Sequence, residues 1–325
     1  MKTAVRSLSI SYKRLEGERR RIQEYLLDPL KIVVIPVTTR KSFFYFKHTE
    51  DYLNTGNRFI RYERKVADKA SATWRKMEES RNMITVRIVG WINLLLAQIS
   101  WMERSLASFP SESNLLKCAR STTGSKKHVR IVSVGHAVEN TEREKQLENC
   151  TPSPVHVYYP SSAMSKDSLV IQLTQFWKEG QSYHLKYLFY CLLALPLTIP
   201  IALVPLLPNV PGFYLLYRAY CNYKAYVGAK HLESLATSNS RPLAFIDLKE
   251  YSDIMSAVAQ PKHTKGKAAA AAASERMVLN EPLLHRVLDN LELHELRRDL
   301  AKAIAQENRR LDAAGRPTKR KEKSL

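Results

Sequence analysis

A run of 31 residues without a single Asp, Glu, Lys, Arg or His constrains the fold of this 325-residue chain more than any other feature. It extends from Tyr187 to Tyr217. An uncharged apolar stretch of more than about 18 residues is long enough to cross a bilayer, whose hydrocarbon core is roughly 30 Å thick. The run therefore favours a segment that lies in lipid.

Five prolines interrupt this run, and each would cost about 3 kcal/mol inside a water-exposed helix. They are Pro196, Pro200, Pro205, Pro208 and Pro211. We interpret residues 185–207 as one proline-kinked membrane helix, followed by a turn at 208–212 that contains Asn209. A re-entrant hairpin whose limbs meet at that turn is the alternative. A helix buried in a soluble domain is a third reading, which the prolines fit poorly because each removes a backbone donor.

Tyrosine and basic residues border the uncharged run on both sides. These residue types collect at membrane–water boundaries, where the ring is half wet and the cation reaches toward headgroups. We expect the following residues to anchor the segment at the interface: Tyr187, Tyr214, Tyr217, Arg218, Tyr220, Lys224 and Lys230. Ordinary packing of tyrosines in a protein core is the alternative. The interfacial reading sets the domain boundaries of this segment at 183 and 235.

The block LPLTIPIALVPLLPNVPGFYLLYRAY, followed by GAKHLESL, resembles the mitochondrial K+/H+ exchange-related family. Three further stretches fit the same family: IVVIPVTTRKSFFYF, KVADKASATWRKMEES with VGWINLLLAQISWMERSLASFP, and VHVYYPSS. The resemblance covers residues 31–235. It implies an inner-membrane-associated protein linked to potassium–proton exchange. The acidic residues usual for the family after the proline-poor helix are reduced here to Glu103.

The chain is strongly basic, with a formal net charge of +20. Residues 1–30 and 309–325 carry +3 and +5 of it, which leaves +12 for the middle. Such a surface favours anionic lipid headgroups or nucleic acid. The first 15 residues hold four basic, no acidic and three serine residues. This is transit-peptide composition, and we assign residues 1–28 to a leader with cleavage as late as Asp28.

Residues 29–182 have the pattern of a small soluble α+β domain with a long helix over a mixed or antiparallel sheet. Two short β-branched and aromatic runs, 31–37 and 42–47, predict a β-hairpin. Further strands are expected at 129–134 and 155–159.

Helical patterns follow the hairpin and precede the uncharged run. Residues 57–106 predict a long helix. Its second half, 88–102, is apolar nearly all round, and Glu103 follows it. Burial against the sheet is one reading of that half, and a membrane-surface helix or second span is the other. Ser165 is expected to cap a helix that leads into the membrane segment.

Beyond the membrane segment the sequence predicts less structure. We assign residues 236–280 to a linker, with a weakly structured apolar patch at 242–251. Pro282 begins an amphipathic helix that ends near Leu311 and whose leucine stripe slips once in phase. The stripe suits a coiled coil for self-association or a helix that folds back on the soluble domain. Residues 312–325 are a basic tail.

Motifs for catalysis, phosphate binding or metal binding are absent from the sequence. With no nucleophile elbow, HExxH, CxxC or glycine-rich loop, we expect neither an enzyme nor a cofactor. The four cysteines have no paired spacing and indicate reduced thiols. His184 and His231 flank the uncharged run as speculative titrating groups. The alternative for each is a hydrogen-bonded ring.

The uncharged run also limits the possible transport mechanism. A proton-coupled exchanger normally holds an ionisable group at membrane depth, and this run has none. We therefore expect an accessory or regulatory subunit of K+/H+ exchange in the mitochondrial inner membrane. An oligomeric pore lined by freed carbonyl groups is a second hypothesis. A basic membrane-bound scaffold, or an RNA- or ribosome-associated protein, is the alternative function. Expected partners are anionic lipids and other inner-membrane proteins, ahead of nucleic acid.

Overall fold

The computed structural model describes nine continuous segments and scattered positions between residues 62 and 81. The segments are 21–48, 83–111, 117–121, 129–132, 150–152, 154–202, 210–237 and 243–259, together with 275–315 at the C-terminal end. Of the tail expected at 312–325, residues 312–315 are helical instead and the rest lies outside this description, as do the alanine-rich stretch at 260–274 and the first 20 residues.

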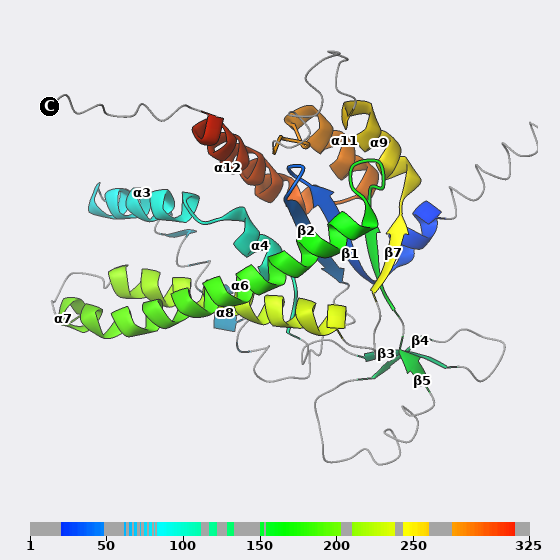
Figure 1. Ribbon diagram of the computed structural model, residues 1–325. Coiled ribbons are helices and arrows are strands. Elements are labelled where there is room, and N and C mark those ends of the chain that lie inside the picture. The colour runs from blue at the N-terminus through cyan, green and yellow to red at the C-terminus, as the bar shows by residue number, and fades with distance from the viewer. Residues whose placement is uncertain are drawn as a thin grey trace, which may run out of the picture.

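A mixed four-stranded sheet forms the centre of the molecule (Figure 1). Its order is β2 (Ser42–His48), β1 (Leu30–Pro36), β6 (Val155–Tyr159) and β7 (Leu243–Asp247). β1 pairs antiparallel with β2, whereas β1–β6 and β6–β7 are parallel. The predicted hairpin and the strand at 155–159 are confirmed, and so is the mixed α+β class.

A second, antiparallel sheet lies at one end of the molecule. Its order is β4 (Val129–Val132), β3 (Lys117–Ser121) and β5 (Cys150–Pro152). The strand expected at 129–134 is therefore present over its described residues, Val129–Val132. β3 is additional, because the sequence analysis predicted no strand at 117–121.

One face of the central sheet is covered by three helices. They are α4 (Trp101–Ala107), α6 (Lys166–Ala194) and α8 (Val210–Thr237). Alternate strand residues face opposite sides of a sheet, and Ile32, Val34 and Phe44 point into this layer. Ser105 accepts the Phe44 amide at 3.1 Å, so α4 also covers the edge of β2. Ser165 caps α6 as predicted, accepting from the Ser168 amide.

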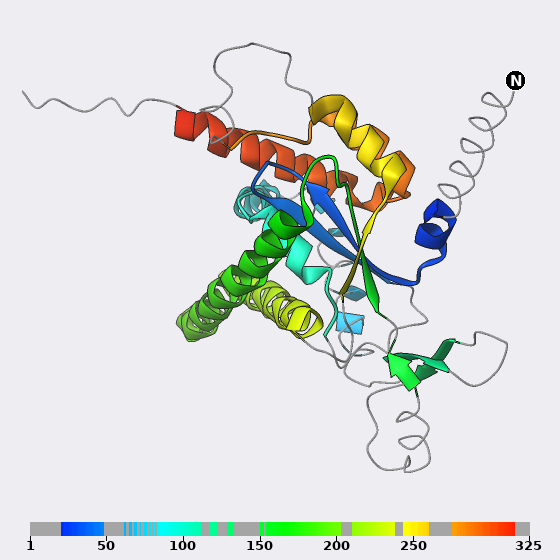
Figure 2. The ribbon, with the colours of Figure 1, turned by 45° about the vertical axis from the view of Figure 1, so that its right-hand side comes forward.

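The other face is covered by the C-terminal helices (Figure 2). They are α9 (Lys249–Ala259), α11 (Glu281–Leu291), the short 3₁₀ turn η4 (His294–Leu296) and α12 (Arg297–Gly315). Val33, Ile35 and Phe43 pack against their leucines. The fold-back reading of this segment is therefore the one observed. The predicted single helix is broken at Glu292, whose left-handed backbone (φ 50°) lies where the leucine stripe slips in phase.

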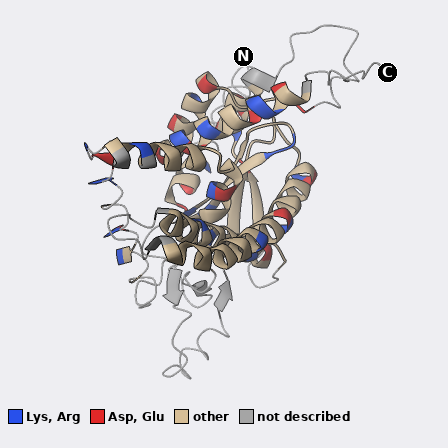
Figure 3. Cartoon of the chain, turned by 90° about the vertical axis from the view of Figure 1, so that its left-hand side faces the viewer, with Lys and Arg blue, Asp and Glu red and all other residues tan. Residues whose placement is uncertain are grey.

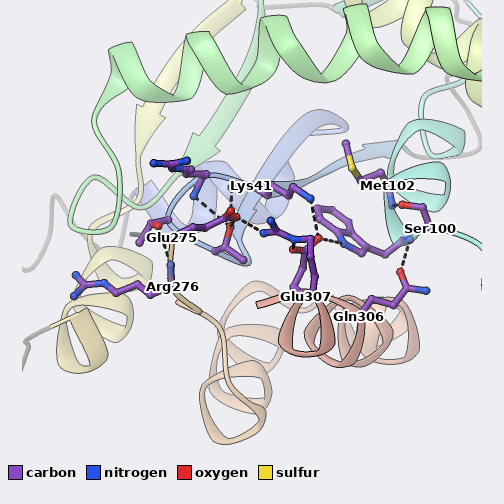
Figure 4. Close-up of polar contacts among 12 residues, drawn as sticks. Lys41, Ser100, Met102, Glu275, Arg276, Gln306 and Glu307 are labelled. Carbon is purple, nitrogen blue, oxygen red and sulfur yellow. Dashed lines mark hydrogen bonds and ion pairs between the residues drawn. The ribbon is translucent and has the colours of Figure 1, made fainter. Parts of the chain in front are cut away.

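A buried carboxylate fixes α12 to the sheet and to α4 (Figure 4). Glu307 accepts from Lys41 Nζ at 3.1 Å and from Trp101 Nε1 at 3.0 Å. It also pairs with Arg310, which reaches Glu275 at 2.5 Å. These hydrogen bonds hold the pKa of Glu307 below its usual range although burial opposes the shift. The charge is thereby kept inside the fold.

Three boundaries differ from the sequence expectations. The supposed linker contributes β7 and α9, because its short apolar runs complete the sheet and cover it. The long helix ends at Ala97 as α3 (Met83–Ala97) and restarts at α4, which Ser100 caps. The assigned leader overlaps the fold, because residues 21–27 are helical and the buried Tyr25 hydroxyl donates to the Leu291 carbonyl at 2.8 Å.

Candidate functional site

Helices α6 and α8 form an antiparallel hairpin that projects from the body (Figure 1). His184 contacts Asn222 at 2.9 Å, and Gln181 donates to Glu233 at 2.8 Å, which fixes the register of the two limbs. A 3₁₀ turn, η3 (Leu195–Thr198), and the short α7 (Ile199–Ala202) continue α6 toward the far end. The two limbs run antiparallel, as in the hairpin alternative, whereas the membrane re-entry of that alternative stays a prediction and its turn at 208–212 lies partly outside the described residues.

The expected kinked helix over 185–207 is corrected by this arrangement. The α-helix stops at Ala194, and Pro196 lies in the 3₁₀ turn that follows, since a proline cannot donate to the carbonyl four residues before it. Pro200 lies in α7, and Pro211 lies in the first turn of α8, where a missing amide costs little. Pro205, Pro208 and Asn209 lie outside the described residues.

No helix in the described part of the chain combines the length and the apolar character needed to cross a membrane. The membrane-spanning part of the predicted fold is therefore without support. Helix α6 is long enough, but Lys178, Glu179 and Lys186 interrupt its apolar character.

The far end of the hairpin exposes large apolar side chains. We call residues 191–217 the apolar tip, of which 203–209 lie outside the description. Leu197 is 78 % exposed, Phe213 69 % and Leu193 64 %. Figure 3 faces this end, where the hairpin is largely tan and the surrounding helices carry most of the blue and red positions. An exposed apolar patch of this kind marks a contact surface for lipid or protein.

Helix α3 exposes a second apolar surface and projects from the same side of the body (Figure 1). Trp91 is 68 % exposed and Leu94 is 65 % exposed. The body holds α3 by its C-terminal end, where Lys302 and Gln306 of α12 donate to the carbonyls of Leu96 and Ile99. The expected burial of residues 88–102 holds for Trp101 in α4 and is wrong for most of α3.

The tyrosines and lysines of the hairpin lie next to the tip. The rings of Tyr183, Tyr187 and Tyr190 form a row, with neighbouring centroids 4.3 and 6.0 Å apart. On α8, Tyr217 and Tyr220 are exposed and Tyr214 is half-buried. The ammonium groups of three lysines lie over tyrosine rings: Lys186 over Tyr190, Lys224 over Tyr220 and Lys230 over Tyr226.

Arg218 points into the protein, unlike the other expected interface residues. Its guanidinium donates to both oxygens of Glu103, at 2.7 and 2.9 Å. Both side chains are largely buried. The Asn222 amide donates to the Arg218 carbonyl and its oxygen contacts His184, so one polar chain joins α4, α8 and α6. The pair clamps α4 to the hairpin at the base of the tip.

Residues 31–236 match the family described as mitochondrial K+-H+ exchange-related. This chain belongs to that family. The match contains β1 from Lys31, β2, β6 and the described hairpin except Thr237, and it ends before the C-terminal helices. The family description thus relates the chain to mitochondria and to K+/H+ exchange.

Two fungal relatives extend the similarity. An uncharacterized protein of Saccharomyces cerevisiae is 39 % identical over 292 residues, covering 90 % of this chain and 89 % of its own length. An uncharacterized protein of Schizosaccharomyces pombe is 26 % identical over 203 residues, covering 62 % of this chain and 74 % of its own. No solved structure matches the chain.

The two histidines singled out in this member of the exchange-related family are both buried. Burial lowers the pKa of His184, with the Asn222 hydrogen bond opposing the shift. The ring is therefore neutral near pH 7, which fits the hydrogen-bonded reading. His231 packs beside the Phe46 ring, with centroids 5.9 Å apart.

The chemistry available at the hairpin is that of a clamp and an apolar surface. The described residues include no group of three or more His, Cys, Asp or Glu side chains placed to hold a metal ion. Glu103, the carboxylate that the fold brings beside the uncharged run, has both oxygens bound by Arg218. Sequence patterns missed this pair because its members belong to elements 115 residues apart.

Proposed function

We propose that this protein is anchored in the mitochondrial inner membrane by the apolar tip and acts there as an accessory or regulatory subunit of K+/H+ exchange. The observation that carries the anchoring is the exposure of Leu193, Leu197 and Phe213 within a sequence run that has no charged residue. Fully burying each such side chain in an apolar medium contributes about 1.5–3 kcal/mol.

The length of the tip supports insertion into one leaflet. Helix α4 covers α8 as far as Arg218, through the contact with Glu103. From Val210 to Tyr217, α8 extends about 12 Å at 1.5 Å per residue. One leaflet contributes about 15 Å of hydrocarbon, half of the bilayer core. A hairpin of this length enters one leaflet without requiring a helix that crosses both.

Helix α3 supplies a second point of contact in this proposal. Trp91 and Leu94 are exposed on an element that projects from the same side as the hairpin. Two apolar elements attached to one rigid body share the cost of orienting it at a surface, so their contributions to binding add. The arrangement suits a protein that lies on the membrane rather than in solution.

The accessory role follows from the state of the charged groups near the tip. A transported proton or potassium ion needs an accessible carboxylate or a set of oxygen ligands at membrane depth. In the described part of the chain, Glu103 is the carboxylate of the polar chain at the base of the tip. Arg218 already neutralises its charge. We therefore assign ion movement to a partner protein of the inner membrane, whose activity this chain governs.

Two further expectations are adjusted by the fold. A cleaved leader would end before Ile22, because Ile22 packs against the core that contains Tyr25. Self-association through the helical segment from Pro282 to Leu311 would compete with its own packing, since Leu284 and Leu288 are buried against the sheet. We therefore expect a transport partner to contact the hairpin and α3.

The test compares wild type with a Leu197→Gln/Phe213→Gln variant in mitochondria that lack the native protein. Wild type should stay with the membrane in alkaline carbonate and restore K+/H+ exchange. The variant should be released and fail to restore exchange. Purified wild type alone in liposomes should give no flux. Retention of the variant in the membrane would contradict the anchor, and flux from the purified protein would contradict the accessory role.

A further inference from the structure

We propose that Lys302 and Gln306 of α12 are positioning residues that fix the direction in which α3 leaves the body. The inference rests on the proposed role of α3 as the second apolar contact beside the tip, and it assigns control of that contact to residues outside α3. The family match ends at residue 236, so it does not include these two residues.

The C-terminal end of α3 depends on another helix for its caps. The last carbonyl groups of an α-helix have no partner within the helix. Lys302 Nζ donates to the Leu96 carbonyl at 3.1 Å, and Gln306 Nε2 donates to the Ala97 carbonyl at 3.3 Å. A cation at this end also interacts favourably with the helix dipole, and the last turn of α3 has no basic residue of its own. In the described part of the chain, the hydrogen bonds that join α3 to other elements come from these two side chains.

One side-chain amide spans the break between α3 and α4 (Figure 4). Gln306 Nε2 also donates to the Ile99 carbonyl at 2.8 Å, and Gln306 Oε1 accepts from the Trp101 amide at 3.0 Å. These contacts hold both sides of the connection 98–100. Each residue of that connection has two soft backbone dihedrals, so α3 would be free to turn about it if the caps were removed.

Helix α12 is a firm support for these caps. Ile304 is buried in the core between the sheet and the C-terminal helices, and Glu307 accepts from Lys41 beside the β1–β2 turn. The caps therefore relate the direction of α3 to the position of the sheet. Trp91 and Leu94 are exposed on α3, so the direction in which they are presented depends on this attachment.

A fixed direction matters because a membrane surface has to meet the hairpin and α3 together. Both elements project from the same side of the body (Figure 1). When only a fraction of the molecules holds the competent arrangement, the apparent affinity falls in proportion to that fraction. An attachment that orders α3 in advance removes this loss, because the ordering cost does not have to be met on binding.

The first measurement is the spread of distances between α3 and the body. Spin labels are attached through Asn93→Cys on α3 and Gln175→Cys on α6, two exposed positions, in the full chain with its four native cysteines replaced by serine. The distance distribution should be narrow in otherwise wild-type protein and broad after Gln306→Leu or Lys302→Met. Lys302→Arg keeps a charged donor and should keep the distribution narrow.

Arg309→Gln is the matched control. Arg309 is exposed on the same helix and is not one of the caps, so its loss should leave the distance distribution unchanged. A distribution that stays narrow after Gln306→Leu, or that broadens equally after Arg309→Gln, would overturn the positioning role.

The second measurement is binding to vesicles of phosphatidylcholine and phosphatidylglycerol. Gln306→Leu should weaken binding about fivefold, which corresponds to a competent direction populated about one fifth of the time. In a Trp91→Gln/Leu94→Gln background, where α3 has lost its apolar contact, the same substitution should have no further effect. A general structural defect would weaken binding in both backgrounds and would overturn the proposal. Wild type that binds no vesicle would instead contradict the proposed anchor, and the distance measurement would still decide the positioning role.

Discussion

The C-terminal helices and the hairpin use similar side chains for opposite purposes. Leu288 of α11 is 2 % exposed and packs against the sheet, whereas Leu197 beyond α6 is 78 % exposed. Both segments are rich in leucine, and both lie against the same sheet through part of their length. The leucines of α11 stabilise the fold, and those of the tip remain available for another molecule.

The same contrast holds for charge. Glu307 on α12 is satisfied by Lys41, Trp101 and Arg310 and joins three elements of the body. On the hairpin, the Glu103–Arg218 pair lies at the base of the tip. The tip beyond it has an uncharged sequence. The hairpin therefore packs as part of the body up to Arg218 and forms an exposed contact surface beyond it.

Breaking the pair at the boundary between these regions should have the largest effect. Glu103→Gln leaves the buried Arg218 charge uncompensated, which should lower the free energy of unfolding by about 3–5 kcal/mol in urea denaturation. A Glu103→Leu/Arg218→Met double variant should recover most of it. Arg104→Gln is the control, because the Arg104–Asp299 pair is exposed on its arginine side and should be worth less than about 1 kcal/mol. Equal losses of unfolding free energy for Glu103→Gln and Arg104→Gln would contradict a stabilising role for the Glu103–Arg218 pair.

Truncating one leucine in each region tests the contrast itself. Leu288→Ala should cost about 2–5 kcal/mol of unfolding free energy, because it opens a cavity in the core. Leu193→Ala should stay within about 0.5 kcal/mol, as expected for a surface position. Thermal and urea unfolding measure both. A large loss for Leu193→Ala would place the tip inside the body's core.

A glycine at the base of the hairpin should show a smaller but distinct effect. A Cβ on Gly228 would lie 2.1 Å from the Leu106 carbonyl oxygen, too close for α4 to keep its position. Gly228→Ala should therefore destabilise by about 1–3 kcal/mol through overpacking. Gly90→Ala on α3, where the added carbon meets open space, should be neutral or stabilise by up to about 1 kcal/mol. Tolerance of alanine at 228 would contradict the close packing of α4 on α8.

Two histidines should make the smallest contributions to the free energy of unfolding, and these contributions should depend on pH in opposite directions. Burial lowers the pKa of His184 from 6.5, so its contribution to stability is present above pH 6.5 and is lost as the pH falls through the folded-state pKa. The hydrogen bond to Asp28 raises the pKa of His156, so its contribution is present below 6.5 and is lost as the pH rises through the folded-state pKa. Urea unfolding of His184→Asn and His156→Gln across this range should show slopes that change in opposite directions. The same direction for both would contradict the assigned environments.

Local patterns were sufficient to predict the parts of the fold held by neighbours in sequence. The β1–β2 hairpin and the Ser165 cap follow from alternation and from capping chemistry within a few residues. The phase slip of the C-terminal leucines coincides with Glu292, where the helix that was predicted to be continuous is broken. By contrast, β7 is five residues long and is ordered by pairing with β6, which local sequence does not encode.

The candidate site shows where pattern analysis stops. The uncharged run located the tip, and the tyrosines and lysines expected at its border lie on the same hairpin, although their role as interface anchors stays a prediction. Arg218 was placed among them because periodicity does not reveal that Glu103, 115 residues earlier, faces it. The all-round apolar pattern of α3 is the same for a buried helix and a helix against lipid, so only the packing shows that Trp91 is exposed.

The most direct test of the account is the depth of position 197 in a membrane. A fluorophore is attached through Leu197→Cys in a variant whose four native cysteines are serine, with a second label through Asn308→Cys on α12 as the control. On inner-membrane-like vesicles, the label at 197 should be quenched by nitroxides on lipid chains and protected from aqueous iodide, and the label at 308 should behave in the opposite way. A label at 197 that remains open to iodide on membrane-bound protein would contradict insertion of the hairpin.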